Sequence, residues 1–561
     1  MLYLLLIFVL ILNVFNKLNV VDATALDDYV WAEDDHYKYE DMGVTISGKS
    51  LDGKHSWTGY MLNMTSQQWL TPEDVDRSIW WHYLCVIVPD TVDYNNNGTL
   101  WVTGWSNTDG LPTSKDEDIV LSASLAMGTK TIVGALFQIP NEKVIFSGDP
   151  EQMSRGEDAI IAYTWDHFLK DPTKPEWLVR LPMVKAVLRA MDTVTDYVKK
   201  SWPEKNYNLD YYTVAGASKR GWTTWLMGAV DPTRVVAIVP IVLDAVNFIT
   251  VMHHQYQSYN GWSYALEDYY HQNITSRFDD PNMHKLSEIE DPYFYFDRLT
   301  MPKLVVNAVG DEFQQPDDTH YWWSDLPEPK HFLMVPNAEH SLATGILEVV
   351  PAVGRWILAL LRNEKIPQMS WKLNNNVDGN NDGSIELTLD GSVEPKHVRK
   401  YYGYTCTSIP RRDFRFLTAD DPCDCGYLID GNCLNNQSFW KYETLKPTHF
   451  KGNKYIANHD IPEKGWVAFF IDVVYKNPYS DDDIQDENEK LDDEAITEKF
   501  IKFHKNKKSS DVGYERPGGW WPGMIPKLKP GRFEFTTEVS VKPNVFPFDD
   551  CHYAGCKGVL V

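Results

Sequence analysis

Three side chains whose types could together perform acyl transfer occur at separate points of the chain. Ser218, Asp311 and His340 each come directly after a run of apolar residues that is typical of a buried strand. A serine hydroxyl becomes a useful nucleophile only with a base within hydrogen-bond reach and an acid that orients that base. The order serine, aspartate, histidine therefore predicts a nucleophile, an acid and a base that meet at one edge of a sheet.

The segment around the serine indicates how it would be exposed. Residues 211–225, YYTVAGASKRGWTTW, change from a strand-like run to a turn and then to a helix-like run. This is the setting of the nucleophile elbow of α/β-hydrolases, in which glycines beside the serine prevent collisions across a sharp turn. The usual pattern has glycine two places after the serine, whereas this chain has Arg220, with Gly221 one place later. A serine in an ordinary turn is the alternative.

Other residues near these runs leave choices open. The backbone amide of Lys219 is predicted to form half of an oxyanion hole, and the second donor is expected near Gln138 to Asn141, in the loop after residues 131–140. Arg220 either receives an anionic group in the pocket or pairs within the protein. Three carboxylates compete with Asp311 for the role of the acid: Asp244, Glu312 and Glu339. The pair His253-His254 lacks metal-like spacing to other ligands and is expected in a lid or on the surface.

The elements that would position these residues alternate along the chain from about residue 84 to residue 360. Short β-branched runs are separated by longer amphipathic stretches, which predicts an α/β sheet with covering helices. Apolar residues spaced at helical intervals from Val184 to Val198 predict one helix, and a second is expected at about 343–361. The aromatic-rich stretch 249–300 follows the run 235–242 and is predicted to be a lid insertion lining the pocket, although packing alone could explain its aromatic residues.

The character of the sequence changes after residue 366. Strand-like runs at 384–391, 465–475 and 532–541, separated by turn residues, predict a small disulfide-stapled β-sandwich. We therefore expect an α/β-hydrolase-like domain at 24–366 and a β-rich C-terminal domain at 367–561. An acidic and then basic stretch within 478–512 is expected to be a solvated loop insertion.

The N-terminal residues and the cysteines both favour a secreted protein. Residues 1–23 are predicted to be a signal peptide, cleaved after Ala23 or Ala25, although no basic residue precedes the apolar run and a membrane anchor is the alternative. Six of the seven cysteines lie in the last third, an even number that predicts disulfides whose connectivity stays open: Cys406, Cys423, Cys425, Cys433, Cys551 and Cys556. Four sequons are candidate glycosylation sites: Asn63, Asn97, Asn273 and Asn436.

Composition excludes several partner classes. The 561 residues carry a net charge of −26, so the chain has no electrostatic footprint for nucleic acid or for anionic membranes. No cofactor is expected. Residues 378–383 begin like a calcium loop, but the twelfth position is Leu389 where a bidentate glutamate is required, so the segment is interpreted as a turn.

Several long motifs resemble a known family. They are ALDDYVWAEDDHYKY from Ala25, GASKRGWTTWLMGAVDPTRV from Gly216, PIVLDAVN from Pro240, NAVGDEFQQPDD from Asn307 and VPNAEHSL from Val335. Together they resemble the PhoPQ-activated pathogenicity-related proteins, including a secreted amoebal branch of autocrine proliferation repressors. The resemblance runs from about Leu26 to beyond Leu361, and the family shares the Ser-Lys-Arg-Gly elbow. It implies an α/β-hydrolase fold, secretion and, in the amoebal branch, an extracellular signal that restrains proliferation.

Two hypotheses of function follow. The first is a secreted factor on a hydrolase scaffold that restrains cell proliferation through a cell-surface receptor or a secreted protein partner. The second is a secreted serine hydrolase, of peptidase or esterase type, in which a peptide or ester substrate acylates Ser218 and His340 transfers protons. The two are compatible, because a binding scaffold could also retain its chemistry.

Overall fold

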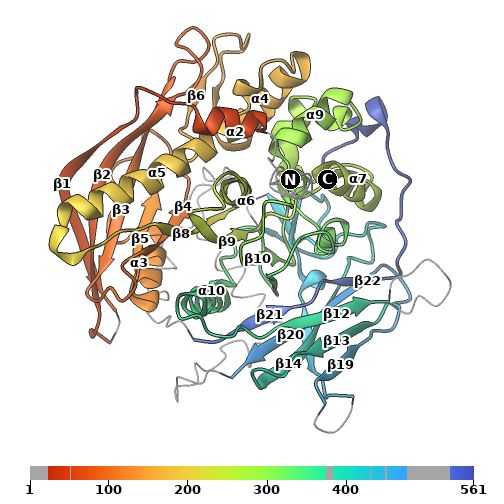
Figure 1. The fold of residues 1–561 in the computed structure, drawn as a ribbon. Coiled ribbons are helices and arrows are strands. Elements are labelled where there is room, and N and C mark those ends of the chain that lie inside the picture. The colour runs from red at the N-terminus through yellow and green to blue at the C-terminus, as the bar shows by residue number, and fades with distance from the viewer. Residues whose placement is uncertain (1–22, 51, 375–382, 430, 449–451, 477–530) are drawn as a thin grey trace, which may run out of the picture.

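A nine-stranded sheet forms the centre of the computed structural model, which describes residues 23–50, 52–374, 383–429, 431–448, 452–476 and 531–561 (Figure 1). The strand order is β1-β2-β3-β5-β4-β8-β9-β10-β11. Neighbours from β5 to β11 in this order run parallel, and β1, β2, β3 and β5 pair antiparallel. The strands are β1 (Lys38–Lys49), β2 (Ser56–Gln68), β3 (Ile79–Pro89), β4 (Asn97–Val102), β5 (Ile132–Leu136), β8 (Tyr211–Ala217), β9 (Val235–Ile241), β10 (Lys303–Ala308) and β11 (Lys330–Val335).

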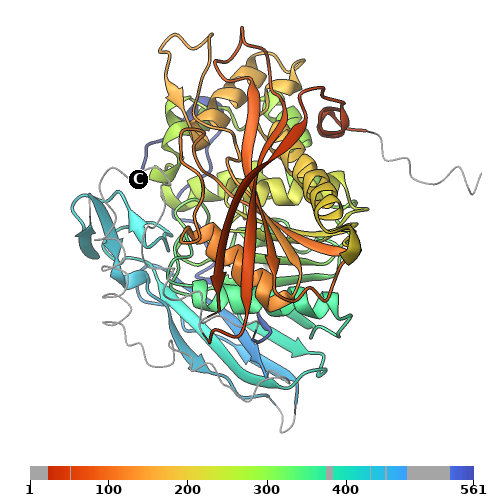
Figure 2. The same ribbon diagram turned by 90° about the vertical axis from the view of Figure 1, so that its left-hand side faces the viewer.

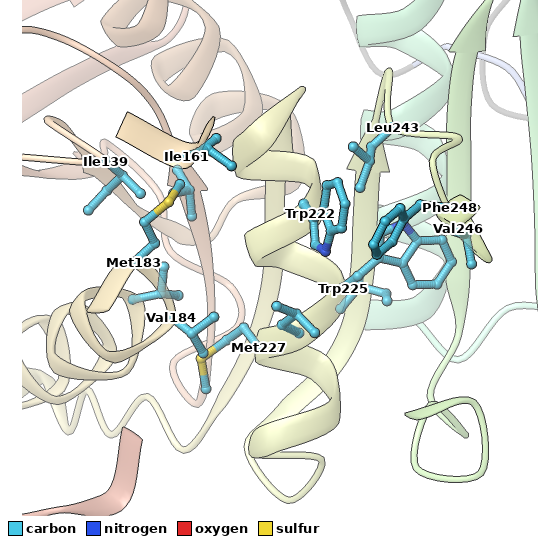
Figure 3. Close-up of a cluster of buried hydrophobic side chains, with 14 of the residues drawn as sticks. Ile139, Ile161, Met183, Val184, Trp222, Trp225, Met227, Leu243, Val246 and Phe248 are labelled. Carbon is cyan, nitrogen blue, oxygen red and sulfur yellow. The ribbon is translucent and has the colours of Figure 1, made fainter. Parts of the chain in front are cut away.

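Helices cover both faces of this sheet, as the alternating sequence predicts, and the chain has the α/β-hydrolase fold. Alternate side chains of one strand enter two different cores: Val214 of β8 packs with helices α5 and α6, and Ala215 packs with α3 and α10. Figure 3 shows Met183 and Val184 of α5 beside Met227 of α6, and Trp222 of α6 toward Leu243 and Phe248. The helices of this domain are α2 (Ala25–Trp31), α3 (Glu117–Thr129), α4 (Glu157–Lys170), α5 (Arg180–Ser201), α6 (Lys219–Val230) and α10 (Ile346–Leu361), with η1 (Pro175–Trp177), η2 (Pro203–Lys205) and the short hairpin β6 (Val144–Ile145) and β7 (Ser154–Arg155).

The N-terminal hairpin of β1 and β2 extends the sheet beyond the strands that the sequence predicts. Both strands are long and twisted where they cross the edge of the molecule (Figure 2). Most β1 side chains are exposed, so its sequence lacks the apolar alternation that marks a half-buried strand.

An insertion between β9 and β10 forms the predicted lid. It contains α7 (Phe248–Tyr259), η3 (Tyr264–Leu266), α8 (Glu267–His271), η4 (Thr275–Arg277), α9 (Pro281–Glu290) and η5 (Pro292–Tyr295). A further short turn, η6 (Asp318–Tyr321), follows β10 and contacts α7. The lid therefore covers the edge where β8, β9 and β10 end.

Three small sheets make up the β-rich C-terminal region. The orders β12-β13-β19 and β18-β14-β20-β21 share one hydrophobic core through Leu387 and Ile471, with β22 also paired to β20. A third sheet has the order β15-β17-β16. The elements are β12 (Met369–Leu373), β13 (Ile385–Leu389), β14 (Pro395–Tyr404), β15 (Leu417–Thr418), β16 (Gly426–Ile429), β17 (Asn432–Asn435), η7 (Asn436–Ser438), β18 (Lys441–Thr444), β19 (Lys454–Ala457), β20 (Val467–Tyr475), β21 (Glu534–Thr536), β22 (Ser540–Lys542) and η11 (Tyr553–Lys557).

All six predicted cysteines form disulfides, but none joins the two larger sheets. Two bonds close the segment of the third sheet, and one closes a loop near the C-terminus: Cys406–Cys425, Cys423–Cys433 and Cys551–Cys556. Cys85 is the one free cysteine within the described residues, and it is buried. After β22 the chain leaves the sheets and returns to the lid (Figure 1).

Several predicted segments lie outside the described residues. These are residues 1–22 of the predicted signal peptide, the 478–512 insertion and residues 378–382 of the calcium-like turn. Among the helices that the structure describes, none combines the length and apolar character needed to cross a bilayer.

Candidate active site

Ser218 lies at a sharp turn between β8 and α6. Its backbone has φ 57° and ψ −128°, a strained conformation for a residue with a side chain. A Cβ atom on Gly216 would lie 2.8 Å from the Arg220 carbonyl oxygen, and one on Gly221 would lie 2.8 Å from the Ile241 carbonyl oxygen. The glycine three places after the serine therefore permits the close packing of α6 on β9, which explains how an elbow forms with Arg220 at the position where glycine is usual.

Three polar side chains meet at the C-terminal ends of β8, β10 and β11. His340 Nε2 lies 2.8 Å from Ser218 Oγ, and His340 Nδ1 lies 2.7 Å from Asp311 Oδ2. The other oxygen of Asp311 accepts a 2.7 Å hydrogen bond from the amide of Phe313, whose ring also packs against the imidazole. This arrangement can deprotonate the hydroxyl, because the base and its orienting acid are both in bonding range.

The three competing carboxylates have other partners. Asp244 accepts a hydrogen bond from Trp322 Nε1, Glu312 accepts one from the amide of His340, and Glu339 bonds Ser341. Burial, with nearby carboxylates, raises the pKa of Asp244 and the pKa of Glu312 well above the usual range. Asp311 is therefore the carboxylate that the imidazole faces.

The side chains of Lys219 and Arg220 are buried in a charge cluster beside the elbow. Lys219 Nζ lies 2.6 Å from Glu157 Oε2 and 3.1 Å from Asp158 Oδ2. Arg220 Nη2 donates to Glu157 Oε1 at 2.6 Å, so the arginine pairs within the protein. Although burial raises the pKa of Glu157, the coulombic attraction of Arg220 and Lys219 outweighs it and lowers that pKa to about 2. The cluster fixes the first turn of α6 to the start of α4.

The expected second oxyanion donor near Gln138 to Asn141 is a wrong prediction for most of that segment. The amide of Gln138 donates to the Gly104 carbonyl and that of Ile139 to the Thr103 carbonyl, while Pro140 has no N–H. The sequence could not reveal this, because β5 lies one strand further from β8 than β4 does. The loop that follows β4, residues 103–106, also lies beside the elbow: a Cβ on Gly104 would touch Arg220 Nη2, while Arg220 Nε donates to the Ile139 carbonyl.

A cavity of about 70 Å³ lies beside Ser218 and His340. The lid insertion supplies much of its wall, as predicted, through residues of α7, η3 and α8 and the chain after η4. The lining is mainly aromatic and aliphatic, and its charged members are Asp158, Arg180 and Lys219. The cavity can hold a small apolar group attached to a carbonyl carbon at Ser218.

The remaining predicted residues lie away from this cavity. His253 bonds Asp550 and His254 bonds Asp318, both at the lid, as expected. Near His253 the described residues hold one cluster of metal-ligand types, but its two cysteines, Cys551 and Cys556, are already joined in a disulfide. Among the sequons Asn273 is exposed, and the other three are half-buried: Asn63, Asn97 and Asn436.

Comparison with known proteins identifies the family of the chain. A family model described as PhoPQ-activated pathogenicity-related protein matches residues 26–415, which include Ser218, Asp311, His340 and the lid. The chain belongs to this family. The family match stops at Arg415, before β15, so most of the β-rich region lies beyond it.

One curated relative is similar over nearly the full length. It is the autocrine proliferation repressor protein A of Dictyostelium discoideum, which is 35% identical over 553 residues, covering 98% of this chain and 96% of the relative. Among solved structures, acetyl xylan esterase 1 from Thermoanaerobacterium is 14% identical with a TM-score of 0.38, covering 60% of this chain and 93% of its own. An acetyl xylan esterase from Paenibacillus is 12% identical with the same TM-score, covering 62% and 96%.

Proposed function

We propose that the protein is a serine hydrolase that cleaves an ester or amide through an acyl-enzyme. The observation that carries this proposal is the pair of contacts that links Ser218 Oγ to His340 and His340 to Asp311. The hydroxyl adds to the substrate carbonyl carbon while His340 Nε2 takes its proton, and the leaving group departs with that proton. Water then repeats the sequence and releases the acid product.

The oxyanion of the tetrahedral intermediate needs two donors. We assign one to the amide of Lys219, which follows the nucleophile at the start of α6, where the helix dipole also favours negative charge. We assign the other to an amide of the loop 103–106, because β4 is the direct neighbour of β8.

An active-site probe tests the enzyme proposal directly. A fluorophosphonate should label the folded protein at Ser218, and Ser218→Ala should abolish labelling without changing the melting temperature. Ser341→Ala is the matched control, because Ser341 bonds Glu339 and should leave labelling intact. Wild-type protein that stays unlabelled while folded would contradict the proposal.

A second function is favoured by the relative named as an autocrine proliferation repressor. We propose that this chain is also a secreted factor that restrains proliferation by binding a cell-surface receptor or a secreted protein. The predicted signal peptide, the three disulfides and the four sequons support export. Cleavage after Ala23 would keep Thr24, whose side chain caps α2, whereas cleavage after Ala25 would remove that cap.

Growth assays separate the two functions. Purified wild-type protein should slow the division of cells of the source organism, and heat-inactivated protein should not. If Ser218→Ala protein slows division equally well, the signal does not need the chemistry. If neither protein changes the division rate at any concentration up to saturation of its binding to cells, the signalling proposal is wrong.

A further inference from the structure

One charged side chain in the wall of the cavity has no role in the triad. Arg180 begins α5 and is only 1% exposed, yet it lines the cavity together with Ser218 and His340. Its guanidinium lies 3.6 Å above the ring of Trp222, so its plane is held against an aromatic wall.

The hydrogen-bonding capacity of this guanidinium is not filled. Nη1 of Arg180 has no hydrogen-bond partner among the described residues, whereas its Nε is paired with a carboxylate. That carboxylate is Glu290, whose Oε2 lies 3.3 Å from Nε and also accepts a 2.7 Å hydrogen bond from Trp165 Nε1, so Nη1 is the donor left for a ligand. Buried donors without acceptors are costly, so a bound acceptor oxygen would recover free energy here.

The local charges indicate what kind of acceptor fits. Glu290 offsets the charge of Arg180, and Glu157 and Asp158 offset that of Lys219. A carboxylate in the cavity would add an unmatched negative charge among apolar walls, whereas a neutral carbonyl oxygen would not.

We infer that Arg180 is a specificity-determining residue that donates a hydrogen bond to a neutral carbonyl oxygen on an otherwise apolar substrate group. This inference rests on the proposed hydrolase function and adds the substrate class to it: small ketone- or amide-bearing acyl groups are preferred over plain hydrocarbon ones. The aromatic side chains contact the hydrocarbon part of the acyl group, and the guanidinium donates a hydrogen bond to its carbonyl oxygen.

Matched esters test the preference. Wild-type protein should hydrolyse 4-nitrophenyl 5-oxohexanoate with a kcat/KM about 10- to 100-fold above that for 4-nitrophenyl hexanoate, because a hydrogen bond from a charged donor distinguishes the two chains. Arg180→Met should abolish this preference, because it lowers kcat/KM for the ketone ester and leaves kcat/KM for the hexanoate ester unchanged. Arg189→Met is the control on the same helix, since Arg189 stacks on Tyr37 instead, and it should keep the ratio.

Loss of Arg180 leaves Glu290 buried without its cation, so the single variant could misfold. The double variant Arg180→Met/Glu290→Gln removes both charges and gives the same expected loss of preference. Fluorophosphonate labelling of each variant reports whether the nucleophile is intact.

Binding without turnover separates this inference from the enzyme proposal. Calorimetry on Ser218→Ala protein should show acetophenone bound at least about tenfold more tightly than ethylbenzene, and Ser218→Ala/Arg180→Met should lose the difference. If the esters are not cleaved but this difference persists, the hydrolase proposal fails and the recognition by Arg180 stands. If Arg180→Met keeps the ketone preference, if the wild type has none, or if benzoate binds more tightly than acetophenone, the inference is overturned.

Discussion

The two sides of the cavity are held in different ways. On the sheet side, Ser218, Asp311 and His340 each follow a strand in the parallel part of one sheet within a few residues. On the lid side, Trp262 pairs with the last residues of the chain: its amide donates to the Val559 carbonyl at 2.8 Å, and its carbonyl accepts from the Val561 amide at 2.8 Å. The triad therefore depends on strand ends up to 122 residues apart within the sheet, and the lid depends on contacts that span almost 300 residues.

This difference indicates that chemistry and substrate binding can be altered separately. The triad needs β8, β10 and β11 to keep their register, and the β-rich region also supports it: the Asn337 side chain donates to the Trp440 carbonyl, and the Phe416 amide donates to the Gly310 carbonyl. The lid also needs the C-terminal tail, here residues 551–561. The tail covers Trp262, and its Cys556 carbonyl accepts a hydrogen bond from the indole N–H. Three variants test whether the two sides are independent.

The largest effect is expected on the sheet side. Asp311→Asn should lower kcat by roughly 10⁴-fold, because the imidazole loses the carboxylate that orients it and stabilises its charge. Glu312→Gln is the matched neighbour and should cost no more than about tenfold, because Glu312 accepts a hydrogen bond from the backbone amide of His340 while the imidazole Nδ1 faces Asp311. Steady-state kinetics on both variants measures the two losses of kcat. Equal losses would show that the acid has been assigned to the wrong residue.

A smaller effect is expected from removing the tail. Deletion of residues 551–561 should raise KM by about tenfold or more and lower the melting temperature by several degrees, because a buried tryptophan becomes exposed. Fluorophosphonate labelling should persist. Hydrogen exchange should quicken in α7 and not in β8. Tyr553→Ala, a change at an exposed tail residue, is the control and should change exchange in neither α7 nor β8. Quickened exchange in β8 would contradict the independence of the two sides.

The smallest effect is a change in the acid dependence of stability. Burial lowers the pKa of His254 to about 3, and Arg412 Nη1 donates to its Nε2, so the folded protein holds the imidazole neutral. In the unfolded chain the imidazole takes a proton below about pH 6.5. The unfolded state therefore binds more protons between pH 6.5 and 3, and this residue removes stability as the pH falls, by at most about 1.4 kcal/mol per pH unit.

Denaturant titrations at several pH values measure this slope. His254→Gln should flatten the decline in unfolding free energy between pH 6.5 and 4, and His271→Gln, at an exposed lid position, should not. An unchanged slope in His254→Gln would show that the imidazole is already protonated in the fold. The groups that face His254 are Asp317, Asp318, Gln315 and Arg412.

Much of the sheet could be predicted, because buried parallel strands have continuous apolar sequences. The runs before Ser218, Asp311 and His340 are of this kind, and the helices α5 and α10 show clear apolar spacing. The hairpin of β1 and β2 could not be predicted, since β1 is largely exposed. The segment expected to supply the second oxyanion donor follows β5, whereas the loop that we propose follows β4; the order of β4 and β5 in the sheet could not be predicted because it is not a property of either strand.

Sequence by itself determined the three reactive groups, their order and the glycines of the elbow, because each depends on residue types within a few positions of one another. Tertiary structure decided which carboxylate faces the imidazole, which loop flanks the nucleophile and that Arg180 lines the cavity. Those choices depend on distances between segments far apart in the chain, and burial then sets which of the groups stay charged.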